Sequence, residues 1–116
     1  MPRPFKWRTV CNLPIIRTFG PLEASKTQDP LIMSVEEYEC IRLIDLEALT
    51  QEECAQRMKV ARTTVQRIYN QARNKLAKAL VLARDLVIEG GSYQLCDGKE
   101  LLSQCGHCHR RGHKNL

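Results

Sequence analysis

Small and apolar residues recur at helical spacing between residues 50 and 70, and the pattern is interrupted only by a short turn. Thr50 and Glu53 have the spacing of a capping box, in which each side chain bonds a main-chain N–H at the start of a helix. The positions that a helix-turn-helix buries are all small or apolar: Cys54, Ala55, Met58, Val60, Val65 and Ile68. The pattern predicts two helices around a tight turn.

The same periodicity extends in both directions. Ala72, Leu76, Ala79 and Ala83 continue the buried stripe, so we predict one long helix over 62–83. Upstream, Ser34 and Glu37 form a second predicted capping box, with Met33 and Tyr38 as its hydrophobic staple. That box begins a predicted helix over 35–48, which packs Tyr38, Ile41 and Ile44 inward.

The period changes after Ala83. Gly90 and Gly91 stand between two short apolar runs, which is typical of a two-residue β-hairpin. Pairing outward from this turn sets Ile88 opposite Tyr93 and Leu86 opposite Leu95, so that one face is wholly apolar. The predicted fold is therefore mainly α, with a small hairpin after the long helix. The hairpin is either a wing beside a recognition helix or a cover for the core.

The outward positions of the long helix carry hydrogen-bonding side chains of the kind that reach base edges and phosphates in a DNA groove. They are Arg62, Thr63, Thr64, Gln66, Arg67, Asn70 and Arg73. Residues 61–84 hold six basic residues and no acidic one, within a chain of net charge +5. A solvated helix face normally mixes signs, so this segment favours double-stranded DNA as the partner.

Residues 49–68, followed by 72–76, resemble the helix-turn-helix of region 4 in bacterial sigma factors. Through residues 1–4, 34–43 and 88–93, the chain is also similar to a family of small uncharacterised prokaryotic proteins predicted to bind DNA. The resemblance implies a DNA-binding fold without supplying a target. Two residues depart from the usual pattern. Lys59 stands in the turn where Gly is common, and Ala61 stands where a Ser often caps the second helix.

The first thirty residues hold all five prolines of the chain and are predicted to be an extended basic arm, with a short strand at 9–13. Arg3, Lys6 and Arg8 surround Phe5 and Trp7. This segment is either a groove-entering arm or one that its aromatic residues attach to the core.

The last twenty-one residues are rich in cysteine and histidine. Cys105 and Cys108 have the spacing that presents two thiolates to one zinc ion, and His113 adds a third ligand. Cys96 is the nearest candidate for the fourth ligand, and Cys11 is the alternative if the N-terminal strand pairs alongside residues 92–96. The segment is otherwise a polar tail, or a redox or metal sensor that uses the same thiols.

These patterns divide the chain into an arm (1–30), a helix-turn-helix domain with its hairpin (31–95) and a Cys/His-rich tail (96–116). The chain shows no signal peptide, membrane span or catalytic constellation, so we expect a cytoplasmic protein that is not an enzyme. The sequence favours a transcriptional regulator that acts as a homodimer, because one helix-turn-helix reads only a few base pairs. The alternatives are a sigma-like module that contacts RNA polymerase and a metal or redox sensor.

Overall fold

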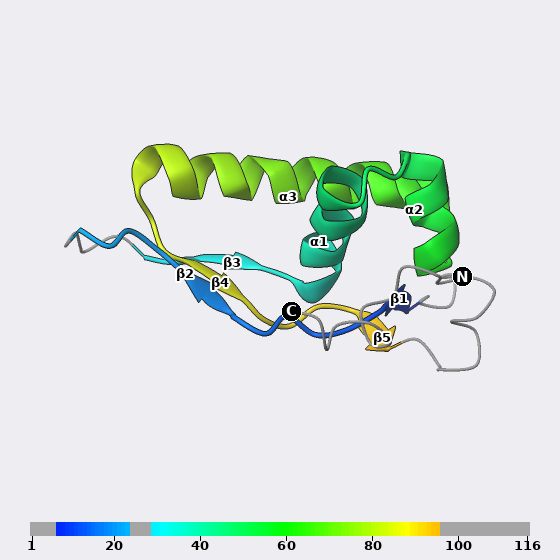
Figure 1. Cartoon of the computed structure of the whole chain (residues 1–116), viewed down its shortest axis with the longest axis horizontal. Helices are drawn as coiled ribbons and strands as arrows, with labels where there is room; N and C mark the ends of the chain where they lie inside the picture. Colours follow the sequence, from blue (N-terminus) through cyan, green and yellow to red (C-terminus); the bar gives the residue numbers. More distant parts are fainter. Residues whose placement is uncertain (1–6, 24–28, 96–116) are drawn as a thin grey trace, which may run out of the picture.

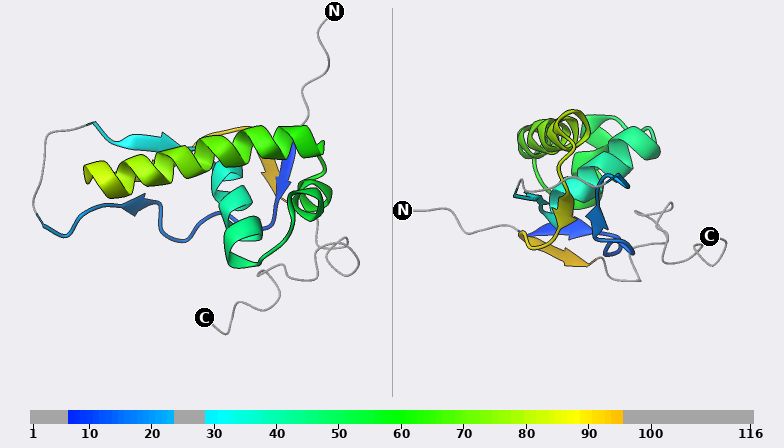
Figure 2. Two further views of the ribbon diagram at one scale, coloured as in Figure 1. Left: turned by 90° about the horizontal axis from the view of Figure 1, so that it is seen from above. Right: turned by 90° about the vertical axis from the view of Figure 1, so that its left-hand side faces the viewer.

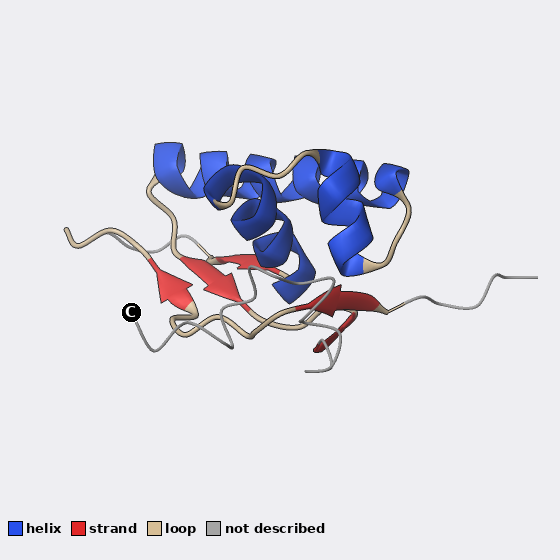
Figure 3. Ribbon diagram, turned by 45° about the vertical axis from the view of Figure 1, so that its right-hand side comes forward, coloured by secondary structure: helices blue, strands red, loops and turns tan. Residues whose placement is uncertain are grey.

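Helices and strands form two layers in the computed structural model, which describes residues 7–23 and 29–95 (Figure 1). In chain order the elements are β1 (Arg8–Val10), β2 (Thr18–Phe19), β3 (Leu31–Met33), α1 (Val35–Cys40), the π-helix η1 (Ile41–Leu46), α2 (Gln51–Met58), α3 (Arg62–Leu82), β4 (Leu86–Ile88) and β5 (Tyr93–Leu95). The helices lie on one side of the strands (Figure 3). The described chain is therefore a mixed α/β fold, and the mainly α prediction underestimated its strands.

The strands form two small sheets. In the first, β4 lies between β2, which is antiparallel to it, and β3, which is parallel to it. In the second, β1 pairs in parallel with β5, so that Arg8 lies opposite Tyr93 and Val10 opposite Leu95. The second sheet thus joins strands from the two ends of the described chain.

The predicted β-hairpin is wrong, because β4 and β5 belong to different sheets. Gly90 and Gly91 instead carry the chain past the start of α1. The Gly90 carbonyl accepts a hydrogen bond from the Val35 N–H (3.0 Å), and the Ser92 N–H donates to Oε1 of Glu36 (2.9 Å). Gly91 has φ 114°, and a Cβ at this position would collide with the Glu36 carboxylate. Gly91 is needed for the close passage against α1, Gly90 adopts a positive φ of 75° that favours glycine, and no wing forms at this place.

The predicted arm also needs correction within its described part. Residues 8–10 and 18–19 are strands of the two sheets, and Val10 and Cys11 are buried. The strand predicted over 9–13 exists, but it begins and ends earlier. Arg8 therefore belongs to the folded body.

Both predicted capping boxes are present. Ser34 Oγ accepts from the Glu37 N–H (3.2 Å), and Glu37 Oε1 accepts from the Ser34 N–H (2.9 Å). Thr50 and Glu53 make the same reciprocal pair at the start of α2. The helix predicted over 35–48 ends earlier, since the helical run stops at Leu46 and Ala48 adopts a positive φ.

The core lies between the layers. The inward residues predicted for α2, and Val65, Ile68 and Ala72 of α3, are buried in it, whereas Tyr38, Ile41, Ile44 and Val60 are only partly buried at its edge. Cys40 and Leu43 come from α1 and η1, Cys54 and Met58 from α2, and Val65 and Ile68 from α3. The strands add Val10, Met33, Leu86 and Ile88 from below. Among the described helices, none combines the length and apolarity that crossing a membrane requires.

A candidate nucleic-acid interface

The turn between α2 and α3 fixes the angle at which α3 leaves the body. Lys59 ends α2 in the left-handed conformation (φ 60°, ψ 44°), and its N–H donates to main-chain carbonyls of α2. The Val60 N–H donates to the Ala55 carbonyl (3.1 Å), which closes the turn. Ala61 precedes α3 without a side-chain cap. The turn thus forms with a non-glycine residue at positive φ and without a side-chain cap on α3, and main-chain hydrogen bonds hold it.

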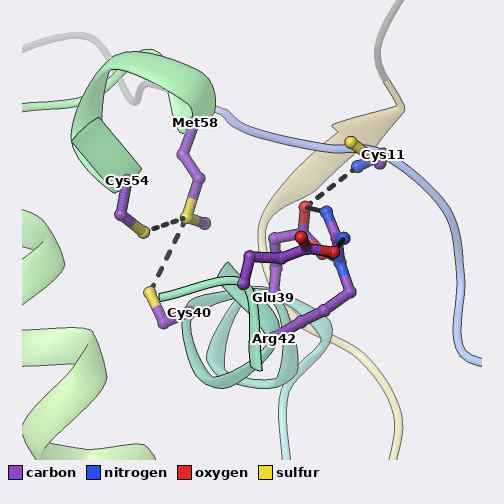
Figure 4. A network of polar contacts seen from close by, with 7 residues as sticks. Cys11, Glu39, Cys40, Arg42, Cys54 and Met58 are labelled. Carbon is purple, nitrogen blue, oxygen red and sulfur yellow. Dashed lines mark hydrogen bonds and ion pairs between the residues drawn. The ribbon is translucent and has the colours of Figure 1, made fainter. Parts of the chain in front are cut away.

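Sulfur atoms lie at the centre of the contact between α1 and α2. The Cys40 and Cys54 thiols each donate to the Met58 thioether, at sulfur–sulfur distances of 3.7 Å (Figure 4). All three side chains are fully buried. The interaction with Cys54, followed by burial, raises the pKa of the Cys40 thiol. The cysteines therefore pack as small apolar residues, as the pattern predicted for Cys54, and hold α2 in place against α1.

A buried ion pair between α1 and η1 also binds Cys11, the residue that follows β1. Arg42 donates to both carboxylate oxygens of Glu39 (2.9 and 2.8 Å), and one of these oxygens also accepts from the Cys11 N–H (3.2 Å). Figure 4 shows the three residues converging. Burial alone would lower the pKa of Arg42, but the hydrogen bonds and charge of Glu39 raise it above its ordinary value. Arg42 therefore keeps its charge, and the ion pair anchors the helix layer to the strand layer.

The N-terminal half of α3 presents the predicted polar face. α2 packs at this end of α3 (Figure 2). Thr64 is half-buried, whereas the other predicted residues of α3 are exposed: Arg62, Thr63, Gln66, Arg67, Asn70 and Arg73. The helix thus brings six of its seven predicted residues to the surface.

These exposed side chains divide into two groups. Arg62 Nη1 donates to the Gln51 amide oxygen of α2 (3.2 Å), which orients its guanidinium. Arg73 donates to the Tyr69 hydroxyl (2.7 Å), and its guanidinium lies over the Tyr69 ring (5.4 Å to the centroid). By contrast, within the described chain Gln66, Arg67 and Asn70 have no intramolecular hydrogen bond from their side chains. Their donors and acceptors remain available to a ligand.

Tyr69 is a residue that the sequence pattern did not single out. Its hydroxyl donates to Oδ1 of Asp45 (2.8 Å) and links η1 to α3. Desolvation and the hydrogen bond to Asp45 raise the pKa of Tyr69, so the hydroxyl keeps its proton. The four-residue spacing of Tyr69 and Arg73 was the signal available in the sequence. In the structure Arg73 also lies 4.0 Å from Asp45.

The basic segment is less uniform than its composition indicates. Lys75 pairs with the buried Glu37 carboxylate (2.8 Å), and Arg84 donates to the Asp29 carbonyl (3.0 and 2.7 Å). Arg62, Arg67 and Lys78 have no carboxylate partner among the described residues. The unneutralised charge of α3 is therefore concentrated on these three side chains.

The remaining predicted residues fall at the two ends of the chain. Arg3 and Lys6 lie outside the described residues, as do the four predicted zinc ligands Cys96, Cys105, Cys108 and His113. Within 7–23 and 29–95, no three His, Cys, Asp or Glu side chains gather as a metal site. Cys11 was the alternative fourth ligand on the condition that the N-terminal strand pairs alongside residues 92–96. That pairing is present, because β1 pairs with β5 and Val10 lies opposite Leu95.

Comparison with known proteins gives a family. A family model described as "Protein of unknown function DUF134" matches residues 1–96. A UPF0251 protein of Desulfitobacterium hafniense (strain Y51) is 58% identical over 113 residues, which cover 96% of this chain and 89% of the relative. A UPF0251 protein of Caldanaerobacter subterraneus subsp. tengcongensis is 45% identical over 116 residues, 99% of this chain and 98% of the relative. No solved structure matches the chain.

Proposed function

The chain belongs to the DUF134 family, and we propose that it is a DNA-binding protein, a transcriptional regulator that places the N-terminal half of α3 in the major groove. One observation carries the proposal: Gln66, Arg67 and Asn70 project from a rigid helix and have no hydrogen-bonding partners within the described chain. Exposed donors and acceptors on a helix match what base edges offer in a groove about 12 Å wide.

The side chains have distinct roles in this proposal. Arg67 donates bidentately to the O6 and N7 atoms of guanine, and Asn70 or Gln66 pairs with adenine. Arg62, oriented by Gln51, and Thr63 at the start of α3 contact phosphates, which set the register of the helix on the duplex.

Charge determines the side from which DNA approaches. Glu52 and Glu53 lie in the first turn of α2, where they would repel phosphates. Arg62 and Arg67 lie on α3 and attract them. The duplex therefore approaches α3 and not the acidic first turn of α2.

Selection of bound fragments from a random duplex library tests the proposal. We expect enrichment of one sequence, and we expect Arg67→Ala to relax preference at a single position, at a cost of about 1–3 kcal/mol. Lys78→Ala is the matched control, because it removes the same charge about 16 Å further along the helix. It should leave base preference unchanged.

The proposal fails if Arg67→Ala folds normally and selects the same sequence with the same affinity. Failure of the parent protein to enrich any sequence, together with binding to purified RNA polymerase, would favour the alternative of a sigma-like module that contacts the polymerase.

A further inference from the structure

The C-terminal half of α3 covers an apolar groove. Figure 1 shows α1 and α2 against the N-terminal half of α3 only, while the other half extends over the β2–β4–β3 sheet. A cavity of about 590 Å³ opens between the two, and Phe19, Tyr38, Leu76, Leu80 and Leu86 are among the residues that line it. The fold therefore leaves a hollow beside the part of α3 that no described helix supports.

Apolar side chains also protrude around this groove. Leu80 is 83% exposed, Val81 76% and Phe19 49%. A soluble monomer rarely exposes large side chains of this kind side by side, and such patches mark surfaces that another molecule covers. Leu80 and Phe19 both line the groove and project from its edge. The same face therefore carries a hollow and side chains that could fill an equal hollow on another molecule.

The face is almost free of charge. Among the described residues that line the groove, Arg84 is the one that is charged, and its guanidinium is bound to the Asp29 carbonyl. Two copies of a protein with net charge +5 repel each other over most of their surfaces. This groove is a place where they can meet while bringing few like charges together.

We propose that the groove is the interface of a homodimer, in which Leu80 of each copy enters the groove of the other. A two-fold interface uses the same patch on both subunits, so the patch must be complementary to itself. A protruding Leu80 beside a hollow meets this condition, and burying Leu80 would stabilise the pair through the hydrophobic effect.

The proposed dimer suits the proposed function, on which this part of the argument rests. Leu80 lies on the C-terminal half of α3, so an interface there leaves the N-terminal half, which carries the proposed DNA contacts, open. Gln66 lies about 21 Å along the helix from Leu80. Two antiparallel copies would place their Gln66 residues about 42 Å apart, and an oblique crossing shortens this toward the roughly 34–36 Å of one DNA turn.

Sedimentation equilibrium of the full chain without DNA tests the interface, over protein concentrations from about 1 to about 100 µM. We expect a dimer for the parent protein and a monomer for Leu80→Glu. Asn74→Glu is the matched control: it adds the same charge on the exposed surface of α3, about 120° around the axis from Leu80, and should remain dimeric. Circular dichroism establishes that each variant is folded, and Leu80→Ala provides a milder variant that should weaken association.

The results separate the two proposals. A parent protein that is monomeric throughout, with the groove covered by its own chain or a small apolar molecule, would overturn the dimer without touching DNA binding. A folded Leu80→Glu protein that still dimerises would overturn this choice of surface. A dimer that depends on Leu80 yet enriches no DNA sequence would support the interface while the proposed function fails.

Discussion

Replacing Lys59 with glycine should stabilise the protein, although it removes a side chain. Lys59 adopts φ 60° and ψ 44°, a conformation that costs an L-residue with a Cβ about 1–2 kcal/mol and costs glycine nothing. The N–H of the turn belongs to the main chain, so glycine keeps its hydrogen bonds. Glycine also has more conformational freedom in the unfolded chain, and this entropy offsets about 0.5–1 kcal/mol of the stabilisation. The expected net gain is about 0.5–1 kcal/mol in the free energy of unfolding.

Thermal unfolding measures this gain. For a domain of this size, we expect the melting temperature of Lys59→Gly to rise by about 2 to 6 °C. Ala48→Gly should change stability in the same direction, because Ala48 has φ 66°. Ala77→Gly is the opposing control, since Ala77 is an exposed residue inside α3, where glycine lowers stability by about 1 kcal/mol. If Lys59→Gly lowers the melting temperature as much as Ala77→Gly does, the left-handed conformation assigned to Lys59 is wrong.

Three further outcomes are expected. Glu39→Gln should lower the free energy of unfolding in urea by about 3 kcal/mol, the lower end of the range for a broken buried ion pair, because the buried Arg42 guanidinium loses its closer carboxylate and keeps only Glu47. Glu47→Gln, which removes the longer and more exposed ion pair, should cost far less. Deleting residues 1–6 should flatten the salt dependence of DNA binding, measured as the slope of log affinity against log salt, by about 0.9 for each phosphate that the arm neutralises, while base preference is kept. Metal analysis under reducing conditions should find one zinc per chain, absent from Cys105→Ser and Cys108→Ser, and a zinc content near zero in the parent protein would refute the site.

Local signals predicted the helices well. The apolar stripe from Val65 to Ala79 depends only on residues three or four apart, so it located α3 without knowledge of the rest of the fold. The capping boxes at Ser34 and Thr50 are equally local and mark the observed starts of α1 and α2. Most of the candidate interface follows from α3 alone, and for this reason its exposed residues could be named in advance.

The strand layer could not be predicted in the same way. Gly90 and Gly91 carry a turn signal, but the partners of β4 and β5 lie more than fifty residues earlier in the chain. A local pattern does not reveal such partners. The burial of charged side chains could not be predicted from the sequence for the same reason. Glu36 and Glu39 look like solvated helix residues, yet Ser92 and Cys11 reach them from distant segments.

The order of strands in the larger sheet has a consequence for synthesis on the ribosome. β4 is the central strand, but the chain makes both of its neighbours first, and about 70 residues separate Phe19 from its partner Leu86. At about 5–20 residues per second, β2 waits roughly 4 to 14 s before β4 emerges. During that time β2 and β3 lack the strand between them, and their exposed edges invite pairing with other nascent chains. Chains truncated before residue 86 should therefore bind chaperones or aggregate instead of forming a smaller folded domain.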